Sequence, residues 1–367
     1  MKRVLCITAT VNAGGAETFL MKIYRQMDRS AYQMDFCINV PEKCFYEDEI
    51  LALGGKVYRI PPKSDSVKQF RKQLLRVIRE NGYQYVLRIT SNAAGFMDLK
   101  IAHQAGARVC AARSSNSSDG GSFKAFLSHK MGRFLYGKYV NLKIAPSDLA
   151  AIYTFGKKAY KNGQVHMLHN AIDLGVYQYD AEQRKKLRSE FHISDDMTVI
   201  GHVGRFMQQK NHEFLLDVFL EFTKLNKKGC LMLVGKGELE EQVRRKAESL
   251  GLMDKVIFTG VRPDVPALLS AMDVFAFPSF YEGMPNTVIE AQATGLPCVI
   301  SDTITRDVNI TGLVEYLPLQ NAKYWAETLL KLSKKQRADT KKAFLEHHYD
   351  IESTCHQFVE LIFGDKI

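Results

Sequence analysis

Residues 198–205 decide the fold, and they read Thr198-Val199-Ile200-Gly201-His202-Val203-Gly204-Arg205. An apolar, β-branched run over 198–203 that ends in a glycine indicates a buried strand followed by a turn. An amphipathic stretch over 213–225 and a second apolar run over 230–234 come next along the chain. A strand, a helix and a strand in that order indicate parallel strands joined by a helical crossover.

The same alternation extends through the rest of the chain. On the C-terminal side it predicts strands at 255–259, 274–278, 297–301 and 313–317, with a helix at 239–250. On the N-terminal side it predicts strands at 4–11, 34–40, 56–60, 85–90, 108–112, 142–145 and 165–168, with helices at 16–27, 47–53 and 67–80. The pattern breaks near residue 170. We therefore expect an α/β protein with two Rossmann-like, doubly wound domains that face a cleft, with ligands at the carboxyl ends of the strands.

Charge is distributed unequally between the two halves. Residues 1–170 contain 26 Lys and Arg against 12 Asp and Glu, a net charge of +14, while the remainder contains 24 against 28. The overall value of +10 is therefore not that of a uniformly basic protein. Nucleic-acid binding is not expected, because the sequence contains neither a recognisable reading motif nor a pattern of aromatic stacking on a basic surface.

The cysteines and the apolar runs bear on the cellular location. None of the seven cysteines forms a C-x-x-C pair, and Cys6, Cys110, Cys230 and Cys298 occur in strand-like runs. We expect them to be buried reduced thiols, which indicates the cytoplasm. No run of about 18 apolar residues is present to span a membrane, and the first apolar run is interpreted as a strand and not as a secretory signal.

Three glycine-containing segments are candidates for holding phosphate. Gly14-Gly15-Ala16-Glu17 follows the first predicted strand and opens a helix, where an anion can bind; a simple tight turn explains it equally well. Arg205 with Lys210 can hold a diphosphate from two sides, although a solvated pair is at least as common. The third segment, Gly235-Lys236-Gly237, is compatible with close backbone approach.

The most informative segment runs from Pro278 to Ala291. Glu282 is expected in the loop after a strand, and Glu290 about one turn inside a helix that opens near Pro285-Asn286. Amides between Gly283 and Asn286 can hold a phosphate or sugar oxygen, and a neighbouring carboxylate can accept hydrogen bonds from sugar hydroxyls. By itself a glutamate pair at this spacing is common on solvated helix faces.

Taken in order, these segments resemble those of a retaining glycosyltransferase of family 4, with the GT-B fold, of the bacterial capsule, exopolysaccharide or O-antigen type. The matching segments span essentially the whole chain and are 14–17, 170–173, 203–205 with Lys210, 234–237, 258–262, 278–279, 282–290 and 295–301. The family's final helix commonly crosses back to the first domain, and residues 351–363 match it. The resemblance thus implies an acceptor-binding domain of residues 1–168 plus 351–367, and a nucleotide-sugar-binding domain of residues 169–350.

The resemblance also implies roles for individual residues. Arg205, Lys210 and Glu282 are the expected catalytic residues: the two cations bind the donor diphosphate, and Glu282 holds the donor sugar. The expected substrate-binding residues are Gly14, Gly15, Asn170, Gly235, Val261, Arg262, Gly283, Met284, Asn286 and Glu290. Among them, Glu290 would bind the ribose, Val261 and Arg262 would lie near the base, and Gly15 would approach the diphosphate. No D-x-D motif occurs, so catalysis without a metal or another cofactor is expected.

The sequence departs from the family pattern at one place. Many relatives carry an H-S-H-N-like segment where this chain has Arg113-Ser114-Ser115-Asn116. Ser115 aligns with a histidine, and a hydroxyl cannot titrate near neutral pH as imidazole does. Arg113, Ser115 and Asn116 are assigned to the acceptor side. Two other histidines, His103 and His129, are expected on helix surfaces, and residues 114–122 form either a mobile acceptor loop or a plain linker.

Two basic amphipathic segments account for part of the charge of the first half. Residues 67–80 place Lys68, Lys72, Arg76 and Arg79 on one face, and residues 123–138 mix phenylalanine and leucine with lysine and arginine. Such helices can lie on an anionic membrane. Alternatively, they pack on a sheet with solvated outer faces. The first interpretation places the protein at the inner face of the cell membrane as a peripheral enzyme.

The expected function is transfer of a sugar from a nucleotide sugar to a glycan or lipid-linked acceptor. Uridine is the preferred base, with guanosine next. One alternative is a GT-B-fold nucleotide-sugar epimerase, which would need acid and base residues around the sugar ring. The other is a catalytically weak, basic membrane-binding relative.

Overall fold

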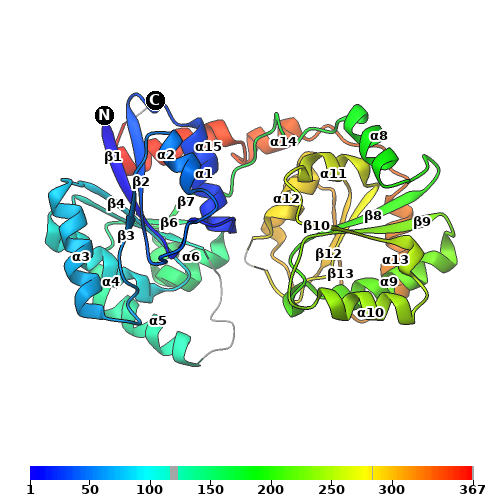
Figure 1. The fold of residues 1–367 in the computed structure, drawn as a ribbon, viewed down its shortest axis with the longest axis horizontal. Helices are drawn as coiled ribbons and strands as arrows, with labels where there is room; N and C mark the ends of the chain where they lie inside the picture. Colours follow the sequence, from blue (N-terminus) through cyan, green and yellow to red (C-terminus); the bar gives the residue numbers. More distant parts are fainter. Residues whose placement is uncertain (116–122, 283, 366–367) are drawn as a thin grey trace. The chain divides into compact units, whose positions relative to one another are not determined.

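The computed structural model describes residues 1–115, 123–282 and 284–365. The chain divides into two compact units, which are treated separately (Figure 1). Unit 1 comprises Met1–Ala171 and His348–Ile367, and unit 2 comprises Ile172–His347. The sequence placed these boundaries after residues 168 and 350, three residues away in each case.

Unit 1 is built on a parallel sheet with the strand order β3-β2-β1-β4-β5-β6-β7. Its strands are β1 (Lys2–Ile7), β2 (Tyr32–Ile38), β3 (Val57–Arg59), β4 (Tyr85–Thr90), β5 (Val109–Ser114), β6 (Leu142–Ala145) and β7 (His166–Met167). Its helices are α1 (Gly15–Gln26), α2 (Glu47–Ala52), α3 (Val67–Glu80), α4 (Phe96–Ala105), α5 (Phe123–Tyr136), α6 (Asp148–Phe155), α7 (Lys157–Lys161) and α15 (Ile351–Phe363). Two buried apolar clusters cover the two faces of the sheet, as the doubly wound pattern requires.

The last helix of the chain returns to unit 1. Phe358, Val359 and Ile362 of α15 belong to the same buried cluster as α1. The Phe363 ring lies 4.9 Å from that of Tyr32 and 5.0 Å from that of Tyr85. The predicted crossing of the final helix is therefore confirmed, with the bounds expected from its sequence.

Unit 2 contains a second parallel sheet with the order β10-β9-β8-β11-β12-β13. Its strands are β8 (Thr198–Val203), β9 (Gly229–Val234), β10 (Val256–Gly260), β11 (Val274–Phe277), β12 (Cys298–Ser301) and β13 (Val314–Leu317). Its helices are α8 (Ala181–Glu190), α9 (His212–Leu225), α10 (Glu240–Ser249), α11 (Val265–Ala271), α12 (Asn286–Ala293), α13 (Ala322–Leu332) and α14 (Lys341–Glu346). Figure 1 shows helices on both faces of each sheet, so the predicted pair of doubly wound α/β domains is confirmed.

Seven helices were given no residue range from the sequence, namely α4, α6, α7, α8, α11, α13 and α14. Three of them, α8, α4 and α6, lack a clear apolar stripe. In α8 the buried residues are Leu187 and Arg188, and the rest of its sequence is polar. In α4 the buried Asp98 interrupts the apolar pattern. The third, α6, is apolar nearly all round. End signals were present: the Asp180 side chain accepts from the amides of the first turn of α8, and Gly106 ends α4 with a φ of 101°.

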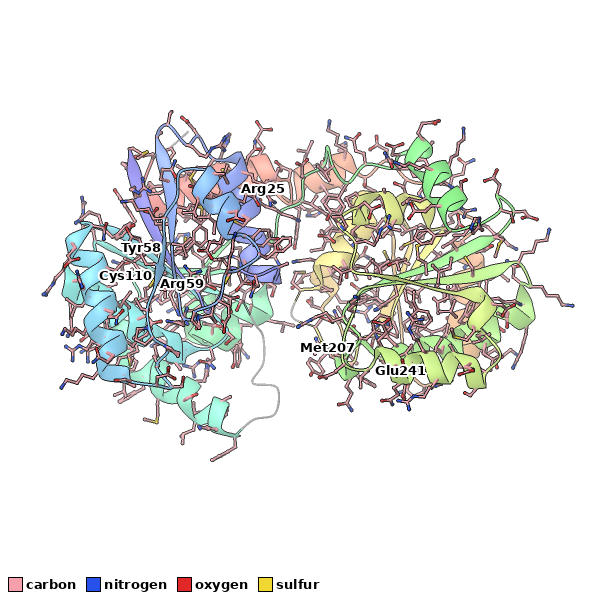
Figure 2. The ribbon with its side chains drawn as sticks, in the orientation of Figure 1. Arg25, Tyr58, Arg59, Cys110, Met207 and Glu241 are labelled. Carbon is pink, nitrogen blue, oxygen red and sulfur yellow. The ribbon has the colours of Figure 1, made fainter. Side chains whose placement is uncertain are left out.

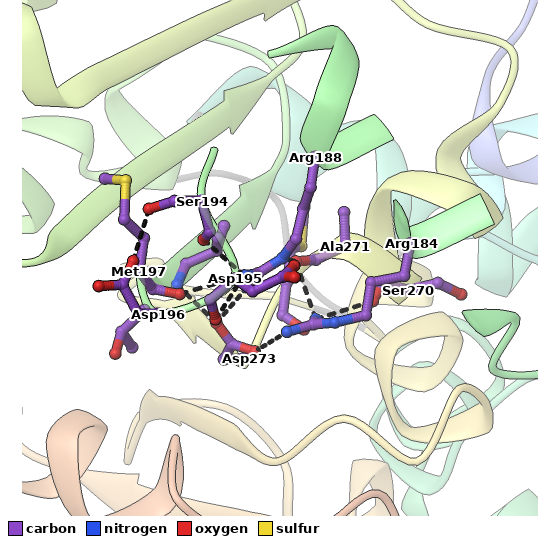
Figure 3. A network of polar contacts seen from close by, with 12 residues as sticks. Arg184, Arg188, Ser194, Asp195, Asp196, Met197, Ser270, Ala271 and Asp273 are labelled. Carbon is purple, nitrogen blue, oxygen red and sulfur yellow. Dashed lines mark hydrogen bonds and ion pairs between the residues drawn. The ribbon is translucent and has the colours of Figure 1, made fainter. Parts of the chain in front are cut away.

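A network of arginine side chains joins α8 to the C-terminal end of α11 in unit 2 (Figure 3). Arg188, only 2% exposed, donates to the carbonyl of Ala271 and to the Asp273 carboxylate. Arg184 donates to the carbonyls of residues 270–272 and to the same carboxylate at 2.7 Å. Cations near a helix C-terminus satisfy its unpaired carbonyls and favour its dipole. Asp273 is the carboxylate that balances both guanidinium groups.

The interior contains all seven cysteines as buried free thiols. Cys110, for example, lies within unit 1 on β5 (Figure 2). Burial raises the pKa of the Cys110 thiol to about 11. The expectation of buried, unpaired thiols is therefore confirmed. Across the described ranges, we find no helix with the length and hydrophobicity needed to cross a membrane.

Candidate functional site

The loops that follow β8, β9 and β10 lie side by side at the carboxyl edge of the unit 2 sheet. The Gly204 amide donates to the carbonyl of Val234 at 2.9 Å, and the Gly235 amide donates to that of Gly260 at 2.9 Å. The Phe206 amide also donates to the carbonyl of Lys236 at 3.2 Å. The predicted glycine segments of this half are thus neighbours, although Gly204 and Gly235 lie 31 residues apart in sequence and Gly235 and Gly260 lie 25 apart.

Glycine is required in these loops because their backbones touch. Gly235 has a φ of +140°, and a Cβ at this position would lie 2.2 Å from the carbonyl oxygen of Gly204. At Gly237 a Cβ would lie 2.3 Å from the carbonyl oxygen of Phe206. The close approach seen here is between neighbouring loops, and the approach to a ligand stays a prediction.

Lys210 and Glu282 form an ion pair at the same edge. The Lys210 Nζ lies 2.7 Å from Glu282 Oε1 and 4.5 Å from the centre of the Phe277 ring. The side chains are 16% and 11% exposed, so solvent screens the pair only partly. Phe277, the last residue of β11, was not among the predicted site residues. The sequence could have indicated Phe277 through its position at the end of a predicted strand, because ligands bind at the carboxyl ends of strands in this type of fold.

Backbone contacts between two loops hold this ion pair in place. The Phe280 amide donates to the carbonyl of Gln209 at 2.9 Å, and the Gln209 side chain donates to the carbonyl of Tyr281 at 2.8 Å. Lys210 ends a 3-10 turn, Gln208–Lys210, whose N-cap is Met207, labelled in Figure 2. The pair is therefore preorganised by its loops.

The remaining predicted residues of unit 2 differ in their surroundings. Arg205 is exposed directly after β8. The Arg262 guanidinium is bound by Asp264 at 2.6 Å and by Glu190 at 2.9 Å, and these carboxylates raise the Arg262 pKa. Val261 is 72% exposed. This region therefore presents an apolar side chain next to an arginine that is already paired.

The 278–291 segment has the local structure expected of it. β11 ends before the loop that carries Glu282, and α12 begins at Asn286, so Glu290 lies about one turn inside the helix. Met284 and Glu290 are partly buried. Gly283 lies outside the described residues.

Two histidines beneath this edge are neutral. His202 is fully buried, and its Nδ1 lies 2.9 Å from the carbonyl oxygen of Ala276, an acceptor, so Nδ1 carries the proton. Burial lowers the pKa of His202 to about 4 and that of the neighbouring His212 to about 2. At neutral pH the positive charge of this edge therefore comes from lysine and arginine side chains, among them Lys210, Lys236 and Arg205, and not from imidazole.

In unit 1 the predicted residues follow β1, β5 and β7, apart from Arg113, which lies near the end of β5. Gly14 is the N-cap of α1, and Gly15 is its first residue. Arg113 donates to Asn170 Oδ1 at 2.7 Å and to the carbonyl of Leu168 at 3.3 Å. Sequence reasoning had not linked Arg113 to Asn170, because 57 residues separate them.

Arg113 requires a correction to its assignment on the acceptor side. Its side chain is 1% exposed, its Cζ lies 3.7 Å from the Phe19 ring centre, and burial lowers its pKa to about 9. The guanidinium is therefore inside the protein and positions Asn170, and it presents no charge at the surface. Ser115 is exposed at the end of β5, with its amide bonded to the carbonyl of Thr90. Asn116 and residues 117–122 lie outside the described residues.

His129 also differs from its prediction. It is 4% exposed, its Nδ1 accepts from the Ala93 amide at 3.1 Å, and its ring stacks on Tyr153 at 4.5 Å. It is a buried packing residue and not a helix-surface histidine, whereas His103 is exposed as expected. In the residues that the structure describes, no three His, Cys, Asp or Glu side chains form a group that could hold a metal ion.

Comparisons with known proteins agree with this architecture. Residues 197–335 match a family model described as "Glycosyl transferases group 1". The chain is 34% identical over 360 residues to "Putative glycosyltransferase EpsF" of Bacillus subtilis (strain 168), an alignment that covers 96% of this chain and 94% of the relative. It is 29% identical over 142 residues to an Escherichia coli "UDP-Gal:alpha-D-GlcNAc-diphosphoundecaprenol alpha-1,3-galactosyltransferase", which covers 38% of this chain and 37% of that protein.

Solved structures share the fold over the full length. Anabaena HepE in complex with UDP aligns with a TM-score of 0.77 at 17% identity and covers 100% of both chains. At this identity the likeness concerns the fold alone, and it identifies the fold as GT-B. Together with the match to EpsF, which extends over nearly all of both proteins, it leads to one conclusion: the chain is a glycosyltransferase and belongs to the glycosyl transferases group 1 family.

Proposed function

We propose that this protein is a retaining glycosyltransferase of family 4 that transfers a hexose from a UDP-sugar to a glycan or lipid-linked acceptor in bacterial surface polysaccharide synthesis, such as that of capsule. The observation that carries the proposal is the partly buried Lys210–Glu282 pair at the carboxyl edge of the unit 2 sheet. In doubly wound folds this edge is where nucleotides bind.

The lysine can serve two partners at once. An ammonium group has three N–H donors, and Glu282 takes one of them at 2.7 Å. The other donors can bind a diphosphate oxygen while Glu282 keeps the side chain oriented. Arg205, which is exposed directly after β8 and shortly before Lys210 in the sequence, supplies a second cation. In this proposal the two cations neutralise the charge that develops on the leaving diphosphate, without a metal or another cofactor.

We assign the other predicted residues to the remaining parts of the substrates. Glu290, on α12, would bind the ribose, and Glu282 with the amides near Met284 and Asn286 would bind the sugar. Because the Arg262 guanidinium is held by two carboxylates, the exposed Val261 is the better candidate for packing against the base. Unit 2 is thus proposed as the donor domain and unit 1 as the acceptor domain. Gly14, Gly15 and Asn170 of unit 1 are proposed as substrate-binding residues, with Gly15 approaching the donor diphosphate.

Relatives support the choice of donor and acceptor. HepE was solved in complex with UDP-glucose. The Escherichia coli relative is named for a UDP-Gal donor and a diphosphoundecaprenol-linked acceptor. Another partial relative, from Salmonella typhi, is named for Vi polysaccharide biosynthesis. These names favour uridine over guanosine and a lipid-linked acceptor over a free sugar.

Retention requires the acceptor to attack on the face from which the leaving group departs. In the proposed step the acceptor oxygen bonds to the anomeric carbon as the bond from that carbon to the phosphate oxygen breaks. The departing phosphate oxygen takes the acceptor proton, so no protein base is needed. This fits the region around Lys210, where His202 and His212 are buried and have lowered pKa values.

The test is UDP release from a panel of UDP-sugars, with a lipid-linked disaccharide acceptor and a glycan acceptor. We expect Lys210→Ala to lower turnover by about 10²–10³-fold, the usual loss when one transition-state donor is removed. Glu282→Gln should also lower it. Lys228→Ala removes an exposed lysine of the same unit and should leave turnover unchanged.

Four results would contradict the proposal. Unchanged turnover in Lys210→Ala would refute the site assignment. An epimerised donor without UDP release would indicate an isomerase. A product with inverted anomeric configuration, read from the coupling constant of its anomeric proton, would refute retention. Loss of activity in EDTA that is restored by Mg²⁺ would refute metal-free catalysis.

A further inference from the structure

Helix α5 is attached to unit 1 through its small and polar residues. The residues of this helix that are buried are His129 and Gly132. A Cβ at Gly132 would lie 2.3 Å from the carbonyl oxygen of Ala93, so the two backbones are in direct contact there. His129 accepts from the amide of the same Ala93. In α3, by contrast, the buried residues are Phe70, Leu74 and Ile78, as in an ordinary amphipathic helix.

The large apolar side chains of α5 consequently face outward. These side chains, with their exposed fractions, are Phe123 (77%), Phe126 (40%), Leu127 (49%), Met131 (53%), Phe134 (87%) and Leu135 (45%). They follow the i, i+3, i+4 spacing of one helical face, here called the outer face of α5. Single exposed apolar residues are normal on a protein surface, but a contiguous group of six marks an interaction site.

Basic residues border the outer face without acidic partners. Lys124, Lys130, Arg133 and Lys138 are distributed along this stretch, and residues 120–147 contain no Asp or Glu. Within the described residues, none of these four forms an ion pair. The Lys130 Nζ lies 4.5 Å from the Phe126 ring, so positive charge and apolar surface are adjacent. The partner of this face should therefore be both apolar and anionic.

We propose that the outer face of α5 docks on an anionic lipid bilayer, with its phenylalanines in the acyl region and its lysines at the headgroups. A bilayer supplies an apolar phase and negative charge in the required order. A second copy of this face would bring like charges together, and a nucleic acid would leave the apolar side chains in water. Of the two interpretations of the basic helices, simple packing on a sheet holds for α3 but not for α5. The inference does not depend on which sugar the enzyme transfers.

The test is flotation of the full-length protein with vesicles of phosphatidylcholine, with or without 30% phosphatidylglycerol, at low and high salt. We expect binding to the anionic vesicles that salt weakens. The double variant Phe126→Ser/Phe134→Ser should lose at least about tenfold in partitioning, since each phenylalanine would transfer its apolar surface from water. Phe45→Ser removes a phenylalanine of unit 1 that is 72% exposed outside α5 and should bind as the wild type does.

A second pair of variants tests the charges. Lys124→Gln/Lys130→Gln should weaken anionic-vesicle binding more than Lys68→Gln/Lys72→Gln, which makes the same change in net charge on α3. The proposal would be overturned if the wild-type protein did not float or if the phenylalanine variant floated normally. It would also be overturned if the wild type were a dimer and the phenylalanine variant a monomer. Donor hydrolysis without vesicles should be equal in wild type and variant. Vesicle binding without any donor turnover would support this inference while contradicting the proposed function.

Discussion

Replacing Asp273 by alanine should destabilise unit 2 more than any comparable change in an exposed ion pair. Its carboxylate accepts from Arg184 Nη2, from Arg188 Nη2 and from the Val199 amide, each at 2.7 Å (Figure 3). Arg188 is 2% exposed, and desolvation lowers its pKa. Without Asp273 a buried guanidinium loses its counter-charge, a change that costs about 3–5 kcal/mol.

The assay can isolate unit 2 because the sequence contains one tryptophan. Trp325 is fully buried on α13 and donates to the carbonyl of Pro318 at 2.8 Å, so its fluorescence reports unfolding of unit 2. With a urea m-value of about 2 kcal/mol/M, the loss corresponds to a midpoint about 1.5–2.5 M lower. Asp273→Ala should therefore shift the transition far outside experimental error.

Two controls make this prediction specific. Asp196 pairs with Lys228, and both side chains are more than half exposed, so Asp196→Ala should have little effect. The double variant Asp273→Ala/Arg188→Met removes both charges and should recover part of the lost stability. If Asp273→Ala lowered the midpoint no more than Asp196→Ala, or if the second substitution added a further loss, the buried-charge explanation would be refuted.

Three further predictions follow from other buried groups. The folded pKa of His202, about 4, lies below its usual 6.5. The unfolded chain therefore binds this proton more tightly, and unit 2 should lose stability as the pH falls from about 6.5 to about 4. Urea midpoints detected by tryptophan fluorescence should depend less on pH in His202→Phe than in the wild type. Gly132→Ala should lower the melting temperature measured by circular dichroism, since its Cβ would clash with backbone at a cost of about 1–3 kcal/mol, whereas Gly137→Ala, with nothing within 4 Å, should not. Arg113→Met removes a buried charge that contacts Asn170, and should lower UDP release while leaving the melting temperature unchanged or higher; a lower melting temperature would contradict this.

The exposed face of α5 shows what helical periodicity can predict and what it cannot. The sequence shows that Phe123, Phe126, Phe134 and their neighbours share one helical face, because the helix repeat is local. Whether that face turns inward depends on what the helix packs against. The contact between Gly132 and Ala93 determines which face of α5 is buried. These two residues are far apart in sequence and meet only in the folded chain.

Sequence alone determined the fold class of this protein and the bounds of elements such as β8 and α3. These follow from local periodicity, end signals and the fixed direction of βα crossovers. Tertiary structure alone decided that Lys210 meets Glu282 across 72 residues, that Arg113 is buried against Asn170, and that α5 faces outward. Such contacts depend on how distant segments pack, and no local pattern encodes that packing.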